Sequence, residues 1–173
     1  MMDIEKRLKM GNSRFKKHIF INEVRKNRIE ELSKGQKPFA MVITCSDSRV
    51  IPEEIFSCIF GDLFVIRTAG NVINEGELAS IEYGIEHLNI QYVLVLAHTH
   101  CGAVHSAIHN EKGKYLSPIL DNIKMSICGE CDERRASLTN AFKQVEYIKS
   151  KFPEYQGTIK SALYDIETCE VIF

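Results

Sequence analysis

The feature that most constrains the fold is an alternation of short apolar runs with segments that favour helices. Continuous runs of this kind occupy Phe39–Thr44, Leu63–Ile66 and Tyr92–Ala97, and each has the length and composition of a strand that is buried on both faces. A helix signal follows each run. Because parallel strands require a crossover connection, usually a helix, the alternation predicts a parallel α/β sheet.

Local signals mark the helices between and after these runs. Pro52–Glu54 suits a first helical turn, because proline is tolerated there and acidic residues interact favourably with the helix dipole. Asn74 and Glu77 have capping-box spacing ahead of apolar residues at helical intervals. Gly102 begins another helix directly after the third run. Two more helices are expected over 116–127 and 138–148, separated by the loop 128–131.

The two ends of the chain carry less regular patterns. Residues 3–33 mix charged residues with scattered apolar ones, which predicts one or two surface helices that are broken near Gly11 and Asn12. Towards the other end, apolar residues over 159–166 and 171–173 predict one or two closing strands.

These patterns predict a single α/β domain over residues 1–173. A helical arm at 1–35 precedes a core at 36–173, which holds a mostly parallel sheet of about four strands flanked by helices, with an antiparallel edge strand. Because the arm is too polar to pack fully on its own domain, we expect it to clasp a second subunit.

Composition excludes two classes of partner. Lys and Arg number 22 against 23 Asp and Glu, a net charge of -1, so the excess positive charge that nucleic-acid binding needs is absent. The apolar runs are far shorter than the roughly 20 residues that span a bilayer, and the N-terminus resembles no secretory signal. We therefore expect a cytoplasmic protein that binds neither nucleic acid nor membrane. In such a compartment its six cysteines are thiols, metal ligands or catalytic groups rather than disulfides.

Two clusters of reactive residues follow the first and third apolar runs. Cys45–Arg49 comes directly after the first run, and His98–Cys101 comes directly after the third. Ligands bind at the carboxyl ends of parallel strands, and in a 2-1-3 strand order these two ends are neighbours. Cys45, His98 and Cys101 are therefore expected to converge, and two thiolates with one imidazole form a zinc set that leaves a fourth position open. The alternative is two ordinary buried thiols and a satisfied histidine.

At this point the sequence resembles the β-class carbonic anhydrases. The resemblance covers residues 8 to about 108 and adds a likeness of 164–166 to the family's last strand. The matching motifs, in family order, are Gly11–Phe15, Cys45–Val50, Arg67–Asn71 and His98–Ala103.

The resemblance implies a zinc enzyme. Zinc, one ion per chain, is held by Cys45, His98 and Cys101, with Asp47 and Arg49 as a catalytic dyad beside it. The implied reaction is the reversible hydration of carbon dioxide to bicarbonate and a proton, by attack of zinc-bound hydroxide on CO2. The family also implies a homodimer or a higher multiple of dimers, with the cleft near the subunit interface.

The dyad has a physical rationale of its own. Arg49, with its fixed fork of donors, can hold the Asp47 carboxylate away from the metal and direct one of its oxygens towards the site. Without that hold, Asp47 is a possible fourth zinc ligand, which would close the site. The alternative reading is a surface ion pair of little energetic value.

One segment departs from the family pattern and leaves other functions open. Many members carry a glutamine, which donates a hydrogen bond to bicarbonate, where this chain has Ser57–Gly61. Neither Ile59 nor Phe60 can donate such a bond. One alternative is hydrolysis of carbonyl sulfide or carbon disulfide on the same zinc site. A second alternative is a zinc-binding or redox-sensing protein without turnover.

The remaining candidates have weaker signals. His100, His105 and His109 lie near the expected site, and any of them can carry protons. His105 and His109 also have the i, i+4 spacing of a metal-binding pair, although such pairs more often form only a polar face. Four cysteines are expected to be thiols without a chemical role: Cys58, Cys128, Cys131 and Cys169.

Overall fold

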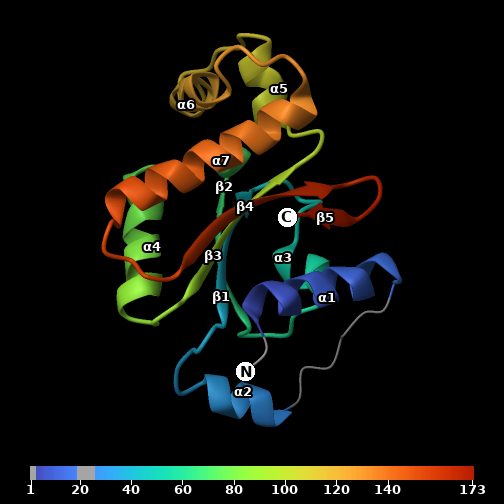
Figure 1. Ribbon diagram of the computed structural model, residues 1–173, viewed down its shortest axis with the longest axis vertical. Helices are drawn as coiled ribbons and strands as arrows, with labels where there is room; N and C mark the ends of the chain where they lie inside the picture. The colour runs from blue at the N-terminus through green and yellow to red at the C-terminus, as the bar shows by residue number, and fades with distance from the viewer. Residues whose placement is uncertain (1–2, 19–25) are drawn as a thin grey trace.

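The computed structural model describes residues 3–18 and 26–173 of the chain and shows a five-stranded sheet with helices around it (Figure 1). The strand order is β2-β1-β3-β4-β5. The first four strands in this order are parallel and β5 is antiparallel to β4. The expected single α/β domain with a mostly parallel sheet and an antiparallel edge is confirmed. The strands are β1 (Ala40–Cys45), β2 (Leu63–Thr68), β3 (Tyr92–His98), β4 (Thr158–Asp165) and β5 (Glu170–Ile172).

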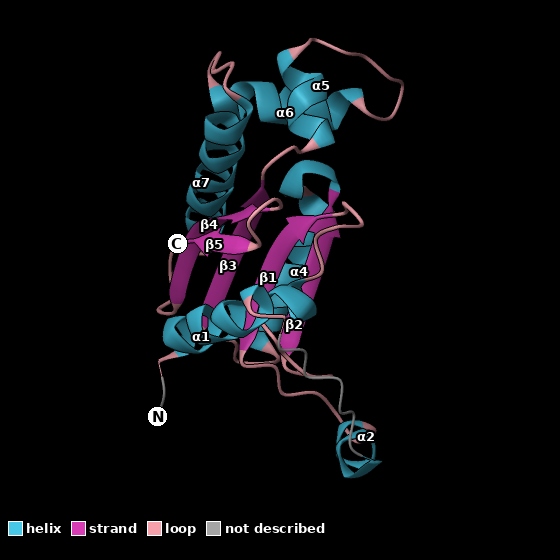
Figure 2. Cartoon of the chain, turned by 90° about the vertical axis from the view of Figure 1, so that its right-hand side faces the viewer, coloured by secondary structure: helices cyan, strands magenta, loops and turns pink. Residues whose placement is uncertain are grey.

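Helices cover both faces of the sheet and one of its ends. The helices are α1 (Ile4–Lys16), α2 (Lys26–Leu32), α3 (Pro52–Ile55), α4 (Glu75–Glu86), α5 (Gly102–Ile108), α6 (Ser117–Ile127) and α7 (Glu133–Lys151), with a short 3-10 turn, η1 (Ala69–Asn71). Figure 2 shows α1 in front of the strands and α4 behind them, with α5 and α6 beyond the end of the sheet. Among the described residues, no helix is long and apolar enough to cross a membrane.

The alternation of side chains along β1 explains its continuous apolar sequence. Met41 and Ile43 pack in the layer beneath α4 and α7, whereas Ala40 and Val42 pack in the layer beneath α1 and α3. Because successive side chains of a strand point to opposite faces, a strand covered on both sides must be apolar at every position. This two-sided burial is why the sequence predicts the central strands well.

The strands continue past the apolar runs at their carboxyl ends. Cys45 pairs with Thr68 at the end of β1, and His98 pairs with Tyr164 at the end of β3. Each strand therefore includes one residue beyond the end of its apolar run in the sequence, Cys45 in β1 and His98 in β3. As a result, Cys45 and His98 sit on the rigid sheet itself.

The expected helix break near Gly11 and Asn12 is wrong, because α1 continues through both residues. Gly11 allows the helix to approach the backbone of Phe56 so closely that a Cβ would lie 1.7 Å from the Phe56 oxygen. The buried Asn12 side chain donates to the Cys169 carbonyl at 2.9 Å and accepts from the Val171 N–H at 2.9 Å. Both residues are thus used for tertiary packing rather than for a turn.

The expectation that the arm is too polar to pack on its own domain is also wrong for α1. Leu8 is fully buried, and the helix contacts α3 and β5 of the same chain. Part of the expected arm, residues 19–25, lies outside the described residues. Of the other sequence signals, the capping box of Asn74 and Glu77 is confirmed at the start of α4.

Candidate metal centre

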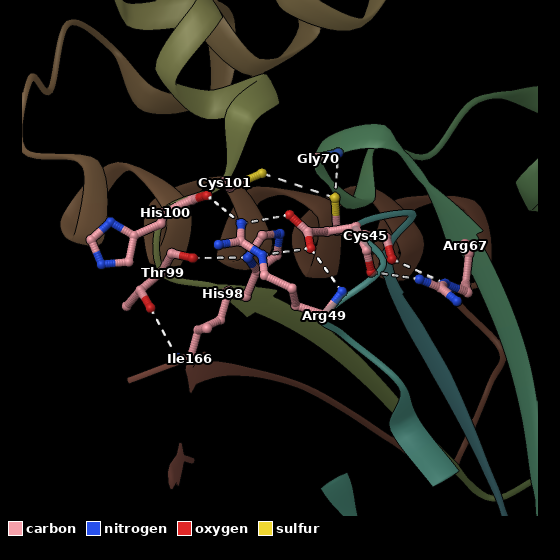
Figure 3. Close-up of polar contacts among 10 residues, drawn as sticks. Cys45, Arg49, Arg67, Gly70, His98, Thr99, His100, Cys101 and Ile166 are labelled. Carbon is pink, nitrogen blue, oxygen red and sulfur yellow. Dashed lines mark hydrogen bonds and ion pairs between the residues drawn. The ribbon is translucent and has the colours of Figure 1, made fainter. Parts of the chain in front are cut away.

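Three potential ligands meet at the carboxyl edge of the sheet. Cys45 ends β1, His98 ends β3, and Cys101 caps the start of α5. All three are buried, and their ligand atoms lie within 4.8 Å of one another. Figure 3 shows the two sulfur atoms facing each other, with 4.0 Å between Cys45 Sγ and Cys101 Sγ. The strand order brings the three together, as the sequence predicts.

The geometry and the donor chemistry fit zinc. A tetrahedral site with Zn–S bonds of about 2.3 Å separates two sulfur ligands by roughly 3.8 Å, close to the observed 4.0 Å. His98 Nδ1 lies 2.9 Å from the Thr99 carbonyl oxygen, which can only accept, so Nδ1 carries the proton. His98 Nε2 then has a free lone pair and is buried without a hydrogen-bond partner in the described part of the chain. Such an arrangement is typical of a metal-binding histidine.

The two cysteines affect each other's ionisation. The hydrogen bond with Cys101 lowers the pKa of Cys45, and His98 and the backbone N–H groups of Asp47 and Gly70 act in the same direction against burial. The same hydrogen bond, together with burial, raises the pKa of Cys101. A metal cation held here would take the place of the thiol proton, because thiolate is the form that binds metal.

Asp47 and Arg49 form a tightly connected pair next to these ligands. Arg49 Nε donates to Asp47 Oδ1 at 2.9 Å and its terminal nitrogen donates to Asp47 Oδ2 at 2.8 Å. The same terminal nitrogen donates to the His100 carbonyl at 3.1 Å. These hydrogen bonds hold the pKa of Asp47 well below its usual range. The ionised carboxylate is thus bound by Arg49, and it does not belong to the group of mutually close ligand atoms.

Arg67, which begins one of the matching family motifs, also contributes to the site, although the sequence indicates no particular role for it. It lies near the end of β2, next to β1, and Figure 3 shows it beside Cys45. Its Nε donates to the Cys45 carbonyl at 3.1 Å, and its terminal nitrogen donates to the Asp47 carbonyl at 2.7 Å. Arg67 therefore holds the backbone on both sides of Ser46. Its signal in the sequence is a charged residue at the carboxyl end of an otherwise apolar strand.

The other candidate histidines lie outside the metal group. His100 is exposed, and its Nε2 lies 3.1 Å from a carboxylate oxygen of Glu167. His105 Nδ1 is 2.6 Å from a Glu133 carboxylate oxygen, and its ring centroid lies 4.1 Å from that of His109, with the rings tilted by 30°. Within residues 3–18 and 26–173, Cys45, His98 and Cys101 are the only set of three or more potential ligands that lie close enough to hold one ion.

The remaining cysteines are unpaired and remote from this group. Burial raises the pKa of Cys58 to about 12, whereas Cys128 and Cys131 are exposed in the loop between α6 and α7. Cys169 is half-buried and also unpaired.

The segment that departs from the family pattern lies at the opposite edge of the sheet. Ser57–Gly61 precedes the amino end of β2, which runs parallel to β1, while Cys45 ends β1. Phe60 is 58% exposed, and its carbonyl accepts from Arg28 at 3.2 Å. Within one chain this segment therefore supplies no group to the metal site.

Comparison with known proteins gives a consistent result. A family model described as carbonic anhydrase matches residues 40–171. The chain is 43% identical over 101 residues to carbonic anhydrase 2 of Mycobacterium tuberculosis, covering 56% of this chain and 49% of that protein. It thus spans about half the length of this curated relative.

Solved structures extend the likeness to almost the whole chain. The β-carbonic anhydrase CcaA superposes with a TM-score of 0.72 at 30% identity, covering 98% of this chain and 94% of that one. Two likenesses at lower identity show the fold alone. They are tetrameric β-carbonic anhydrases of Sordaria macrospora (TM-score 0.70, 24% identity, 83% of each chain) and the apo form of carbon disulfide hydrolase (TM-score 0.61, 16% identity, 84% of this chain and 85% of that one).

The family match includes all of the sheet except the last residue of β5, together with all three converging ligands, and the likeness to a solved β-class structure covers nearly every residue of both chains. The chain therefore belongs to the carbonic anhydrase family, in its β class.

Proposed function

We propose that this protein catalyses the reversible hydration of carbon dioxide to bicarbonate and a proton, with one zinc ion per chain held by Cys45, His98 and Cys101. The observation that carries the proposal is the buried Cys–His–Cys group with an arginine-bound carboxylate beside it. When bound by such a set, zinc supplies Lewis acidity that lowers the pKa of water towards about 7. Two thiolates and a neutral imidazole balance the charge of the ion.

In this proposal Asp47 and Arg49 are catalytic residues that orient the attacking water. Arg49 binds both carboxylate oxygens of Asp47, so the carboxylate keeps one orientation and stays ionised. The remaining lone pairs of the carboxylate accept a hydrogen bond from the O–H of the water at the site. The planar guanidinium is suited to this task because it presents several donors in a fixed fork. Freed from Arg49, Asp47 becomes a fourth zinc ligand and blocks the reaction.

The small, uncharged substrate agrees with the charge of the chain. A net charge of -1 offers little long-range steering, and CO2 needs none. Six unpaired thiols support our placement of the protein in a reducing compartment such as the cytoplasm.

We also propose that the active form is a homodimer or a multiple of dimers. Large apolar side chains are exposed on α2, just before α3 and just before β2, namely Ile29, Ile51 and Phe60. Their burial in a contact between subunits would remove this apolar surface from water. Size-exclusion chromatography with light scattering tests this part of the proposal, and a monomer at micromolar concentration would contradict it.

A stopped-flow assay of CO2 hydration on the zinc-loaded protein tests the activity. We expect turnover that rises with pH and disappears when a chelator removes the metal. Metal analysis of the same sample should give one zinc per chain. A fully loaded protein that does not hydrate CO2 between about pH 6 and 9, a window around the expected pKa of the water, would contradict the proposal and favour a zinc-binding protein without turnover.

A second candidate is the hydrolysis of carbonyl sulfide or carbon disulfide on the same zinc site. It is favoured by Ser57–Gly61, which carries no side-chain amide to donate to bicarbonate. The values of kcat/KM for the three substrates, measured on one zinc-loaded sample, separate the candidates. A larger kcat/KM for either sulfur compound than for CO2 would favour hydrolysis of that compound as the function.

A further inference from the structure

Helix α7 directs two buried amide side chains at the turn that follows β2. Asn140 is fully buried and Gln144 is 3% exposed. Asn140 Nδ2 donates to the Gly70 carbonyl at 2.8 Å, and Gln144 Oε1 accepts from the Ile73 N–H at 3.0 Å. Together they bind both ends of the segment 70–73 to a helix that lies about 70 residues further along the chain.

The same turn touches the candidate metal centre. The Gly70 N–H donates to Cys45 Sγ at 3.3 Å, a contact visible in Figure 3. Gly70 thus donates a hydrogen bond from its N–H to the sulfur of Cys45 and accepts one at its carbonyl from Asn140. The two groups belong to consecutive peptide planes joined at the Gly70 Cα, so the hydrogen bond on the carbonyl restrains the residue whose N–H contacts the sulfur.

The backbone of this turn is one that needs outside support. Gly70 has φ of 64° and Asn71 has φ of 49°, so two successive residues are in the left-handed region. Glycine adopts this conformation freely and asparagine more readily than other non-glycine residues, but it remains less favourable than the right-handed region for Asn71. The space around the turn is also tight, because a Cβ on Gly70 would lie 2.7 Å from Ile123 Cδ1.

Further hydrogen bonds fix the orientation of Gln144. Its Nε2 donates to Asn122 Oδ1 on α6 at 2.9 Å and to Asn140 Oδ1 at 3.4 Å. The two amides and the turn are therefore one connected network across α6, α7 and η1. Buried polar networks of this kind hold one conformation when every member is satisfied.

We propose that Asn140, supported by Gln144, is a positioning residue for the metal centre: it holds the 70–73 turn so that the Gly70 N–H donates to the Cys45 thiolate. This inference rests on the proposed binding of zinc by Cys45. A hydrogen bond to a ligand sulfur draws electron density from it and fixes its direction, and such outer contacts alter metal affinity. Asn140 touches neither substrate nor metal and acts only through Gly70.

The test is the Asn140→Leu variant, which replaces the amide by an apolar side chain of similar size and so removes the Nδ2 donor to the Gly70 carbonyl. We expect its zinc dissociation constant, measured by competition with a chelator, to rise about 10-fold or more. The cobalt-loaded variant should also show a shifted thiolate-to-metal charge-transfer band. Ser137→Ala is a matched control, because Ser137 is buried one turn earlier on α7 and its hydroxyl has no hydrogen-bond partner in the described part of the chain. It should leave both readouts unchanged.

Folding must be separated from positioning. If Asn140→Leu does not fold, Gln144→Glu replaces it, since Glu keeps the acceptor for the Ile73 N–H and loses the donors to Asn122 and Asn140. A measurement on the wild-type protein tests the hydrogen bond from the Gly70 N–H to Cys45 Sγ without any variant. Loaded with cadmium-113, it should show scalar coupling between the metal and the Gly70 amide proton across the N–H···S hydrogen bond.

The outcomes distinguish this inference from the proposed function. A folded Asn140→Leu variant with unchanged zinc affinity and an unchanged cobalt spectrum would overturn the inference while leaving CO2 hydration by the wild-type protein intact. Absence of the cadmium coupling to Gly70 would overturn it as well. A wild-type protein that binds no zinc would instead overturn the proposed function on which the inference rests.

Discussion

The chain has two pairs of cysteines in opposite surroundings. Cys45 and Cys101 are buried at the carboxyl edge of the sheet, with their sulfur atoms 4.0 Å apart and a histidine completing the group. Cys128 and Cys131 are exposed in a loop between two helices, and their sulfur atoms donate to the nearby carbonyls of Met125 and Gly129, each at 3.4 Å. The sequence spacing of the second pair resembles a metal motif more than that of the first.

The difference shows that rigid placement, not spacing, creates the site. Cys45 and His98 end two adjacent strands. Arg67 of β2 donates to the Cys45 carbonyl, and the Gly70 N–H of η1 donates to the Cys45 sulfur. The loop cysteines have no comparable framework and no third ligand close by within the described residues. A metal site needs ligands whose directions are fixed before the ion arrives.

The largest expected effect comes from removing a ligand of the buried pair. Cys45→Ser should lower zinc affinity by more than the roughly 100-fold that loss of an outer contact can cost, and CO2 hydration should fall with it. The double variant Cys128→Ser, Cys131→Ser is the matched control and should keep both. Zinc content after dialysis and stopped-flow rates measure the two quantities. A Cys45→Ser protein that still hydrates CO2 would contradict the claim that the buried cysteines, rather than the loop cysteines, form the metal site.

The next effect concerns the carboxylate beside the buried pair. Arg49→Ala should lower CO2 hydration by about 100-fold, the scale for loss of one oriented donor group at a reacting centre, while zinc stays near one ion per chain. The reason is that Asp47 loses the two hydrogen bonds from the guanidinium, keeps only the one from the Arg49 backbone N–H, and is then expected to bind the metal. Arg49→Lys keeps the charge without the fork and should restore only part of the rate. Full activity in Arg49→Ala would rule out this role.

Thiol reactivity sharpens the contrast between buried and exposed cysteines. Alkylation of the zinc-loaded protein at pH 8, followed by peptide mapping, should modify Cys128 and Cys131 first. Cys58 should react slowly, because burial raises its pKa from 9.0 to about 12 and leaves a thiolate fraction roughly 1,000-fold smaller. Cys45 should become reactive only after a chelator removes the metal. Modification of Cys58 as fast as Cys131 would contradict the burial argument.

The smallest effect is expected at the surface. Hydrogen bonds from Lys160 and Lys9 lower the pKa of Glu5 from 4.5 to about 2. The resulting stability is present above pH 4.5 and is lost as the pH falls through about 2, because the carboxylate must then be protonated in both states. Both lysine side chains are 51% exposed, so solvent screening limits the contribution to less than about 1 kcal/mol.

Urea titrations of Glu5→Gln and of the wild-type protein at pH 7 and pH 3 measure the contribution of the Glu5 carboxylate to the free energy of unfolding. The variant should be less stable than the wild-type protein at pH 7, and the difference should be smaller at pH 3, because part of the contribution is already lost below pH 4.5. A loss of several kcal/mol at pH 7 would show that an exposed pair matters far more than its solvent exposure implies.

The sequence predicts those parts of the fold whose signal is local. Residues such as Val42 and Leu94 are buried between two helical layers, and that burial produces the unbroken apolar runs. Alternation of strands and helices predicts the parallel sheet, and in a 2-1-3 strand order, which the structure has, Cys45 and His98 lie on neighbouring strands. The resemblance to the β class adds the dyad of Asp47 and Arg49, which spacing alone cannot distinguish from a surface ion pair.

What the sequence could not predict depends on contacts between distant segments. Gly11 and Asn12 look like a helix break, but Asn12 is bound by Cys169 and Val171 from the other end of the chain. Asn140 and Gln144 look like ordinary polar positions of a helix, and only their contacts with the 70–73 turn reveal them. No periodicity within α7 marks such residues.

A crystal structure of the protein with anomalous scattering measured at the zinc edge tests the central claim most directly. The claim predicts one zinc peak per chain, bonded to Cys45 Sγ, Cys101 Sγ and His98 Nε2, and none at the loop cysteines. A zinc peak at Cys128 and Cys131, or protein that takes up zinc elsewhere and leaves the Cys–His–Cys group without it, would contradict the claim.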